Sequence, residues 1–117
     1  MWLCLPDAFL SIVHKECADD ELLVRARRRG DIERVFPNAK VVVNRNTDYM
    51  FRARVKRTVV ADALMTQAAT IDYPNFKNEV DNDDLHNAYS AIWNVMYRLQ
   101  NALMGDRRER RQRPMFY

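Results

Sequence analysis

Short apolar and β-branched runs dominate the first part of the chain. Trp2–Leu5 and Phe9–His14 are two such runs, and the Pro-Asp-Ala segment between them favours a turn. This pattern predicts two strands that meet at a sharp bend. Apolar and polar positions then alternate along Leu22–Arg28, which is the two-residue period of a strand with one buried face. We therefore expect three strands before the first helix.

A short helix and a hairpin are predicted next. Asp31 follows a glycine and can cap a helix at Ile32–Phe36, which the following proline ends. Val41–Asn44 and Tyr49–Val55 are two further strand candidates. The Asn and Asp residues between them favour a tight connection, so these two strands should form a hairpin.

Two of the predicted strands separate an apolar face from a basic one. Tyr49, Phe51, Ala53 and Val55 share one side of their strand and are expected in the core. If the two strands pair, their other sides form one cationic sheet face. That predicted basic face consists of Arg25, Arg27, Arg52, Arg54 and Lys56.

Helical periodicity replaces alternation after residue 57. Thr58 is the expected N-cap of a helix that runs to about Thr70 and packs on the sheet. After a linker at residues 72–80, three caps are available at 81–83 for a longer helix. The apolar positions of these two helices are Val60, Leu64, Ala68 and Ile71, and then Leu85, Tyr89, Ile92, Met96, Leu99 and Leu103.

The long helix is expected to end at Gly105, a common C-terminal residue. About twenty residues at 1.5 Å each make a rod of roughly 30 Å, enough to cross a small domain. Such a helix either covers the sheet of its own chain or forms a homodimer through residues 85–103. We expect it to cover the sheet.

The predicted order β-β-β-α-β-β-α-α places the chain in the α+β class. We expect a small antiparallel or mixed sheet of about five short strands packed by two or three helices, with a ferredoxin-like half and a long C-terminal helix. A chain of 117 residues is long enough for one core. Residues 1–105 should form a single domain, and residues 106–117 a flexible tail.

The net charge of +3 is unevenly distributed along the chain. Residues 25–57 hold eleven Lys and Arg against three acids, and residues 106–117 hold five Arg against two acids. The two remaining stretches, residues 1–24 and 58–105, each carry a net negative charge. The acidic residues at 79–84 in the second stretch are candidates to cover the basic face. The arginines of the tail offer a second surface for polyanions. They are Arg107, Arg108, Arg110, Arg111 and Arg113.

No catalytic, metal or cofactor motif is evident. His14 and Cys17 lack a third group that would orient a nucleophile and base. Asp81, Asp83 and Asp84 lack the glycine and distal glutamate of a calcium loop, and helix capping explains them better. The N-terminal apolar run contains Pro-Asp and has no basic segment before it, so we expect a cytoplasmic protein. We expect neither an enzyme nor a cofactor.

Several segments resemble a family of short, uncharacterised bacterial proteins. The similar stretches are Met1–Leu5 with Asp7–Val13, Leu22–Arg27 with Gly30–Pro37, and Ile71–Lys77. The resemblance spans about residues 1–100 and implies no activity, ligand or site residue, because none is known for that family.

Segregated charge without catalytic chemistry favours a binding protein. We expect a non-enzymatic regulator that docks on a protein partner through the basic face, the long helix or both. By analogy of size and charge with small bacterial and phage proteins, such as anti-CRISPR proteins, the partner would be a larger complex that it inhibits. The alternative is direct nucleic-acid binding through the basic face and the Arg-rich tail.

Overall fold

The computed structural model describes the backbone of residues 1–112 and the side chains of residues 1–105. Within these residues, five strands form one sheet in the order β1-β2-β3-β5-β4, and all neighbours are antiparallel. The predicted α+β class is confirmed. The strands are β1 (Trp2–Cys4), β2 (Phe9–Val13), β3 (Glu21–Ala26), β4 (Val42–Val43) and β5 (Phe51–Lys56).

The middle of the chain has the strand order expected of a ferredoxin-like half. β3 is followed by α1 (Asp31–Val35), then by β4, β5 and α2 (Arg57–Ala69). β5 lies between β3 and β4 and is antiparallel to both. β3 and β4 therefore run in the same direction without touching, and α1 lies in the crossover between them.

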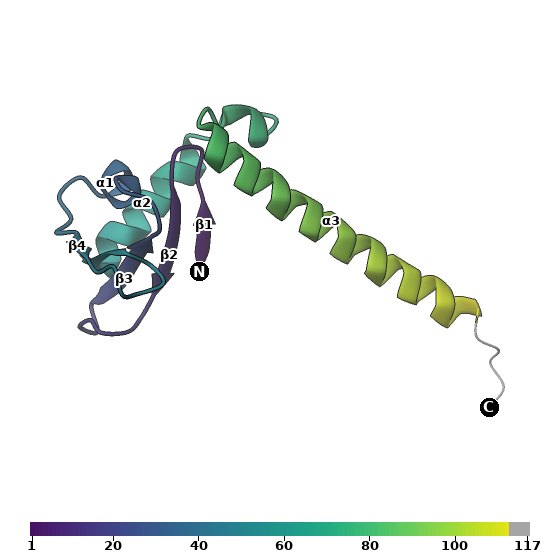
Figure 1. Ribbon diagram of the computed structural model, residues 1–117, viewed down its shortest axis with the longest axis horizontal. Coiled ribbons are helices and arrows are strands. Elements are labelled where there is room, and N and C mark those ends of the chain that lie inside the picture. The colour runs from purple at the N-terminus through teal and green to yellow at the C-terminus, as the bar shows by residue number, and fades with distance from the viewer. Residues whose placement is uncertain (113–117) are drawn as a thin grey trace.

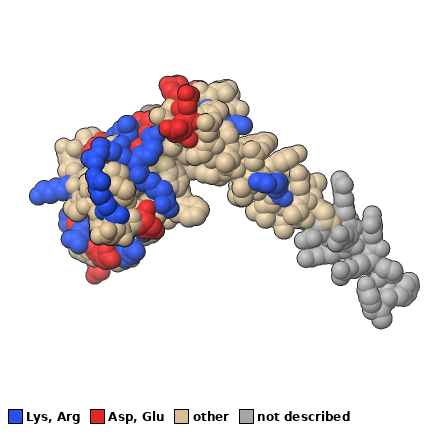
Figure 2. Space-filling model, in the orientation of Figure 1, with Lys and Arg blue, Asp and Glu red and all other residues tan. Residues whose placement is uncertain are grey.

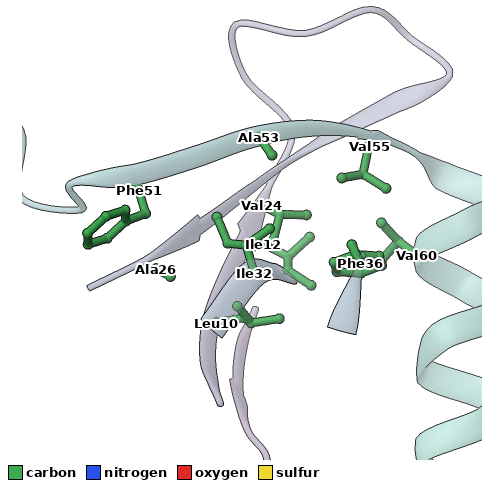
Figure 3. Packing of buried hydrophobic residues seen from close by; sticks show 10 residues of the cluster. All are labelled: Leu10, Ile12, Val24, Ala26, Ile32, Phe36, Phe51, Ala53, Val55 and Val60. Carbon is green, nitrogen blue, oxygen red and sulfur yellow. The ribbon is translucent and has the colours of Figure 1, made fainter. Parts of the chain in front are cut away.

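Helices α1 and α2 cover one face of the sheet and enclose the main core (Figure 3). Ile32 and Phe36 come from α1 and its end, and Val60 comes from α2. Each fully buried large apolar side chain contributes about 1.5–3 kcal/mol, so this layer supplies most of the hydrophobic stabilisation. The strand residues in the cluster are Leu10, Ile12, Val24, Ala26, Phe51, Ala53 and Val55.

Asp31 does not cap α1 as predicted. The helix begins at Asp31 itself, after Gly30 with a φ of 92°, and its N-terminus has no side-chain cap. The buried carboxylate instead accepts hydrogen bonds from the Phe9 backbone N–H (3.1 Å) and from the guanidinium groups of Arg28 and Arg34 (2.8 Å each). It ties α1 to β2, a contact that local capping rules do not include.

Helix α2 continues directly from β5. It begins at Arg57 without a side-chain cap, so the predicted N-cap at Thr58 is wrong. Val60 is buried and Leu64 is partly buried against the core, whereas the apolar residues further along, Ala68 and Ile71, are exposed. Only the first half of the predicted apolar stripe packs on the sheet.

The last helix leaves the rest of the molecule. A 3-10 turn, η1 (Lys77–Glu79), precedes α3 (Asp83–Gln112), which projects far beyond the sheet (Figure 1). The molecule is elongated as a result, with extents of 62 × 33 × 32 Å. We call residues 1–82, which precede α3, the head, and residues 91–105 of α3 the arm.

Two expectations for the long helix are wrong. It does not cover the sheet, because every residue of the arm is exposed. It also does not end at Gly105, since helical backbone continues to Gln112. A glycine within a helix costs only about 1 kcal/mol relative to alanine, so one glycine does not stop a 30-residue helix.

Candidate functional site

The first turns of α3 are anchored to the head by a second, small core. The Leu85 backbone N–H donates to Oδ1 of Asn82 (2.9 Å), so Asn82 caps the helix. Leu85 and Tyr89 are buried with Val80, and partly buried residues of the β1–β2 hairpin and of the preceding loop pack around them. Those partly buried residues are Cys4, Phe9 and Phe76.

Tyr89 is the main polar link between α3 and the head. Its hydroxyl oxygen lies 2.9 Å from the carbonyl oxygens of both Leu5 and Ala8, and it donates its proton to them. Burial raises the pKa of Tyr89 well above its ordinary value, and it likewise raises the pKa of the nearby Cys4 thiol. Both groups are thus held in their neutral forms, which suits a structural junction.

The arm exposes a long apolar surface. Arg98 is the only Lys, Arg, Asp or Glu between Asp84 and Asp106. Figure 2 shows the arm as mostly uncharged, whereas the head carries many charged side chains. Eight large apolar side chains of the arm are each 44–56% exposed: Ile92, Trp93, Val95, Met96, Tyr97, Leu99, Leu103 and Met104.

Two aromatic residues at the base of the arm are held in place. The rings of Trp93 and Tyr97 stack with centroids 5.2 Å apart and planes 8° apart. The Lys77 ammonium nitrogen lies 4.7 Å from the centre of the Trp93 ring, a cation–π contact. A groove of about 420 Å³ lies beside Trp93, where α3 meets the loop at Pro74–Lys77. The arm therefore begins with an ordered aromatic surface.

The predicted basic face exists as a geometric feature. Strands β3 and β5 pair, with Arg25 opposite Arg52 and Leu23 opposite Arg54. Their basic side chains lie on the sheet face that α1 and α2 leave uncovered, because the alternate residues fill the main core. Figure 2 shows that Lys and Arg gather on the head, with Asp and Glu among them.

Carboxylates and carbonyls of the head already contact most of this face. Arg52 lies 3.6 Å from both Glu16 and Asp48, and Arg54 donates to the Glu16 carbonyl (2.7 Å). Lys56 pairs with Asp20 at 2.6 Å, which raises the pKa of Lys56 and lowers that of Asp20. These acids belong to the β2–β3 and β4–β5 connections, not to the 79–84 segment considered from the sequence.

The structure corrects the placement of Tyr49. This residue precedes β5 and lies outside the main core, although its ring is buried. The guanidinium carbons of Arg25 and Arg27 lie 4.5 and 4.1 Å from the ring centre. Arg25 also donates to Ser11 Oγ (2.7 Å), and Arg27 to the Asp48 carbonyl (2.9 Å). The buried ring positions the two arginines and is too covered to stack on a ligand.

Trp2 is a surface residue that the sequence did not single out. The register aligns Trp2 with Ser11, Ser11 with Arg25, and Arg25 with Arg52, so these four residues share the sheet face opposite α1 and α2, on which Ser11 is buried. Trp2 is 76% exposed at the edge of this row. Its strand is apolar on both faces, so periodicity could not show which of its residues point away from the core.

The candidate catalytic and metal-binding residues are not brought together. His14 lies 3.3 Å from the Ala18 carbonyl, and the Cys17 thiol lies 3.5 Å from the Glu21 carbonyl. Among the described residues, no group of three His, Cys, Asp or Glu side chains is arranged to hold a metal ion. None of the helices in this part of the chain is long and apolar enough to span a membrane.

A larger groove runs beside the outer edge of β5. It has a volume of about 920 Å³ and lies between β5, the segment at residues 35–44 and the start of α2. β4 pairs only with Phe51 and Arg52, which leaves the rest of that β5 edge without a neighbouring strand among the described residues. Both apolar and basic side chains line it, among them Phe36, Val59 and Arg54.

The tail arginines lie outside the described side chains. Arg107, Arg108, Arg110 and Arg111 fall within the helical range of α3, while Arg113 lies beyond the described backbone.

Comparison of the chain with protein-family models, with curated proteins and with solved structures gives no match. The resemblance of its segments to a bacterial family therefore stays a prediction.

Proposed function

We propose that this chain is a non-enzymatic binding protein that engages another protein through its arm. The observation that carries the proposal is the exposure of eight large apolar side chains on a helix that projects away from the head. At roughly 100 Å² for each half-exposed side chain, they present on the order of 800 Å². A typical monomer has a largest apolar patch of about 300–600 Å².

The head supports this function by fixing where the arm points. Asn82 caps α3, and Leu85 and Tyr89 join its first turns to the β1–β2 hairpin. Most of the stability of a helix in a protein comes from packing of its apolar face, not from intrinsic propensity. Anchoring one end and covering the apolar side with a partner together account for a helix that would otherwise fray.

Affinity capture from the native host with nuclease-treated extract tests the proposal. The wild-type chain should retain proteins that the double variant Ile92→Glu with Leu99→Glu loses, because each glutamate places a charge in the apolar surface. Asn94→Glu with Asn101→Glu is the matched control, as it adds the same charge to the same helix on its polar side. Equal capture by all three proteins, together with equal masses in solution, would reject the arm as a binding surface.

Nucleic-acid binding through the basic face is the second candidate function. Arg25 and Arg52 are direct cross-strand neighbours, an unfavourable pairing of like charges that a bound polyanion would relieve. Exposed Trp2 lies in the same row and offers a ring for stacking on an unpaired base. The intramolecular contacts of Arg52 and Lys56 weigh against this function, which is why it ranks second.

Titration of fluorescent single-stranded RNA tests the second candidate. Binding should weaken as salt rises, with a slope of about 0.7 in log affinity per log salt for each phosphate contacted. Trp2→Ala and Arg54→Glu should each weaken binding if the face is used. Removal of residues 106–117 separates the tail from the face. Absence of binding at low salt would eliminate this candidate.

A further inference from the structure

The partner that fits the arm best is another α-helix. The apolar side chains of α3 recur every seven residues, at Leu85, Ile92 and Leu99 and again at Tyr89, Met96 and Leu103. The steps alternate between three and four residues, which is the spacing of the contact positions in a pair of coiled helices. Because a seven-residue period keeps one stripe facing a neighbour over several turns, the pattern favours lengthwise helix pairing over contact with a flat surface.

The other helical positions repeat with the same period. Asn87, Asn94 and Asn101 occupy the position farthest from the apolar stripe. Ala88, Val95 and Ala102 flank the stripe on one side and make that flank apolar as well. Three such repeats are present, and Arg98 lies away from the stripe. The stripe and the asparagine positions are those of one member of a helix pair, and exposed Trp93, Tyr97 and Met104 lie outside the stripe.

The charges at the two ends of α3 indicate what the second helix is. Exposed Asp81, Asp83 and Asp84 lie at its start, and the sequence has arginines in its last turns. Figure 2 shows acidic side chains near the base of the arm. A second α3 laid antiparallel points the basic end of each helix toward the acidic start of the other, where the first turns pack on the head. A parallel arrangement would instead place like charges side by side.

We propose that the arm pairs with the arm of a second copy of this chain, in antiparallel orientation. This inference rests on the proposed function, since it names the helix that the arm binds. The heptad spacing places Ile92 of one copy opposite Leu103 of the other, and Met96 opposite Leu99. Leu85 and Tyr89 remain buried in their own head.

The available apolar area is sufficient for such a dimer. Ile92, Val95, Met96, Leu99 and Leu103 are each about half exposed, and two copies supply ten such side chains. At roughly 100 Å² each, pairing removes on the order of 1,000 Å² from water, the lower limit for a specific interface. The charges at the helix ends favour the antiparallel orientation and contribute less to the affinity of the dimer.

The mass of the full chain in solution is the first test. Light scattering after size exclusion should give twice the chain mass of 13.9 kDa at roughly 100 µM protein. Ile92→Glu with Leu99→Glu should weaken the dimer at least about a hundredfold, whereas Asn94→Glu with Asn101→Glu should leave it intact. A single-chain mass for the wild type at that concentration would overturn the proposal. Equal weakening of the dimer in the Asn94→Glu with Asn101→Glu control would overturn it as well.

The orientation is tested by disulfide trapping. A mixture of Ile92→Cys and Leu103→Cys chains should form a bridge between positions 92 and 103 of different copies, located by peptide mass mapping. Mapping also separates this bridge from any that involve Cys4 or Cys17. If each variant alone forms its own symmetric bridge and the mixture forms no 92–103 bridge, the pairing is parallel and the antiparallel proposal is wrong.

The outcomes separate this inference from the proposed function. A monomeric wild type that still captures proteins through Ile92 and Leu99 rejects the second copy and leaves the arm as a binding surface. If neither mass nor capture depends on these residues, both proposals fail. Should the double glutamate variant lose the head's cooperative unfolding, Met96→Gln with Leu99→Gln replaces it in both measurements.

Discussion

Asp31 is the buried carboxylate on which the packing of α1 depends. It accepts hydrogen bonds from the Phe9 backbone and from the side chains of Arg28 and Arg34. We expect Asp31→Asn to lower the free energy of unfolding by about 1.5–3 kcal/mol, because hydrogen bonds to a charged group are lost inside the head. Urea unfolding followed by circular dichroism measures this. Asp20→Asn, which breaks an exposed ion pair, is the control and should change stability little.

Tyr89 links α3 to the head, so removal of its hydroxyl group should lower the free energy of unfolding. Tyr89→Phe removes the hydroxyl that donates to the Leu5 and Ala8 carbonyls, although the Ala8 carbonyl still accepts from the Leu5 backbone N–H, so we expect the free energy of unfolding to fall by about 1–3 kcal/mol at neutral pH. Because the folded-state pKa is raised, the contribution of Tyr89 is complete below pH 10 and is lost as the pH rises further. The stability gap between wild type and Tyr89→Phe should narrow above pH 10. A gap that widens there would contradict this assignment.

At the scale of elements, the two glycines of the chain should respond to alanine in opposite ways. Gly105 lies within α3 and has open space where an added methyl group would lie, so Gly105→Ala should stabilise the helix by about 0.5–1 kcal/mol. Gly30 has a φ of 92°, and an added methyl group would lie 3.2 Å from Arg34, so Gly30→Ala should destabilise the head by about 1–2 kcal/mol. Hydrogen exchange across α3 and chemical unfolding of the head measure the two effects. Faster exchange in Gly105→Ala would be inconsistent with a continuous helix.

The head should also fold without the arm. A chain that ends after Ser90 retains Leu85 and Tyr89 but lacks the exposed part of α3. Its head should unfold within about 0.5 kcal/mol of the monomeric Ile92→Glu with Leu99→Glu chain, because the arm meets the head through little more than the exposed cation–π contact between Trp93 and Lys77. Comparison of urea transitions checks this. A loss of more than about 1 kcal/mol would mean that the arm packs on the head in solution.

At the scale of the whole molecule, antiparallel pairing determines the shape of the dimer. The two heads lie at opposite ends of the paired arms, so small-angle scattering should give a maximum dimension well above the 62 Å of one chain. The double glutamate variant should return to a value near that of the single chain. A dimer whose maximum dimension stays close to 62 Å would have its heads side by side, which requires parallel arms.

The order and type of the elements were predictable because each has its own period. Alternation along β3 and β5 located both strands and the basic face that they share. The same rule misplaced Tyr49, because the strand starts two residues later and the ring turns toward Arg25 and Arg27. Periodicity thus predicts which face a residue takes only where the regular backbone has already begun.

The candidate surfaces depended more heavily on tertiary structure. The stripe on α3 was visible in the sequence, as it follows from seven-residue spacing. Whether that stripe is covered depends on the direction in which α3 leaves Asn82, and this direction is set by the contacts of Leu85 and Tyr89 with the β1–β2 hairpin. Such long-range contacts have no local signature.

By itself, the sequence determined the α+β class, the strand and helix order and the amphipathic character of the last helix, because these depend on local periods of two and of about 3.6 residues. Only the tertiary structure decided that Glu16, Asp20 and Asp48 contact the basic face and that every residue of the arm is exposed. Both outcomes depend on how segments distant along the chain meet in space, which no local pattern specifies.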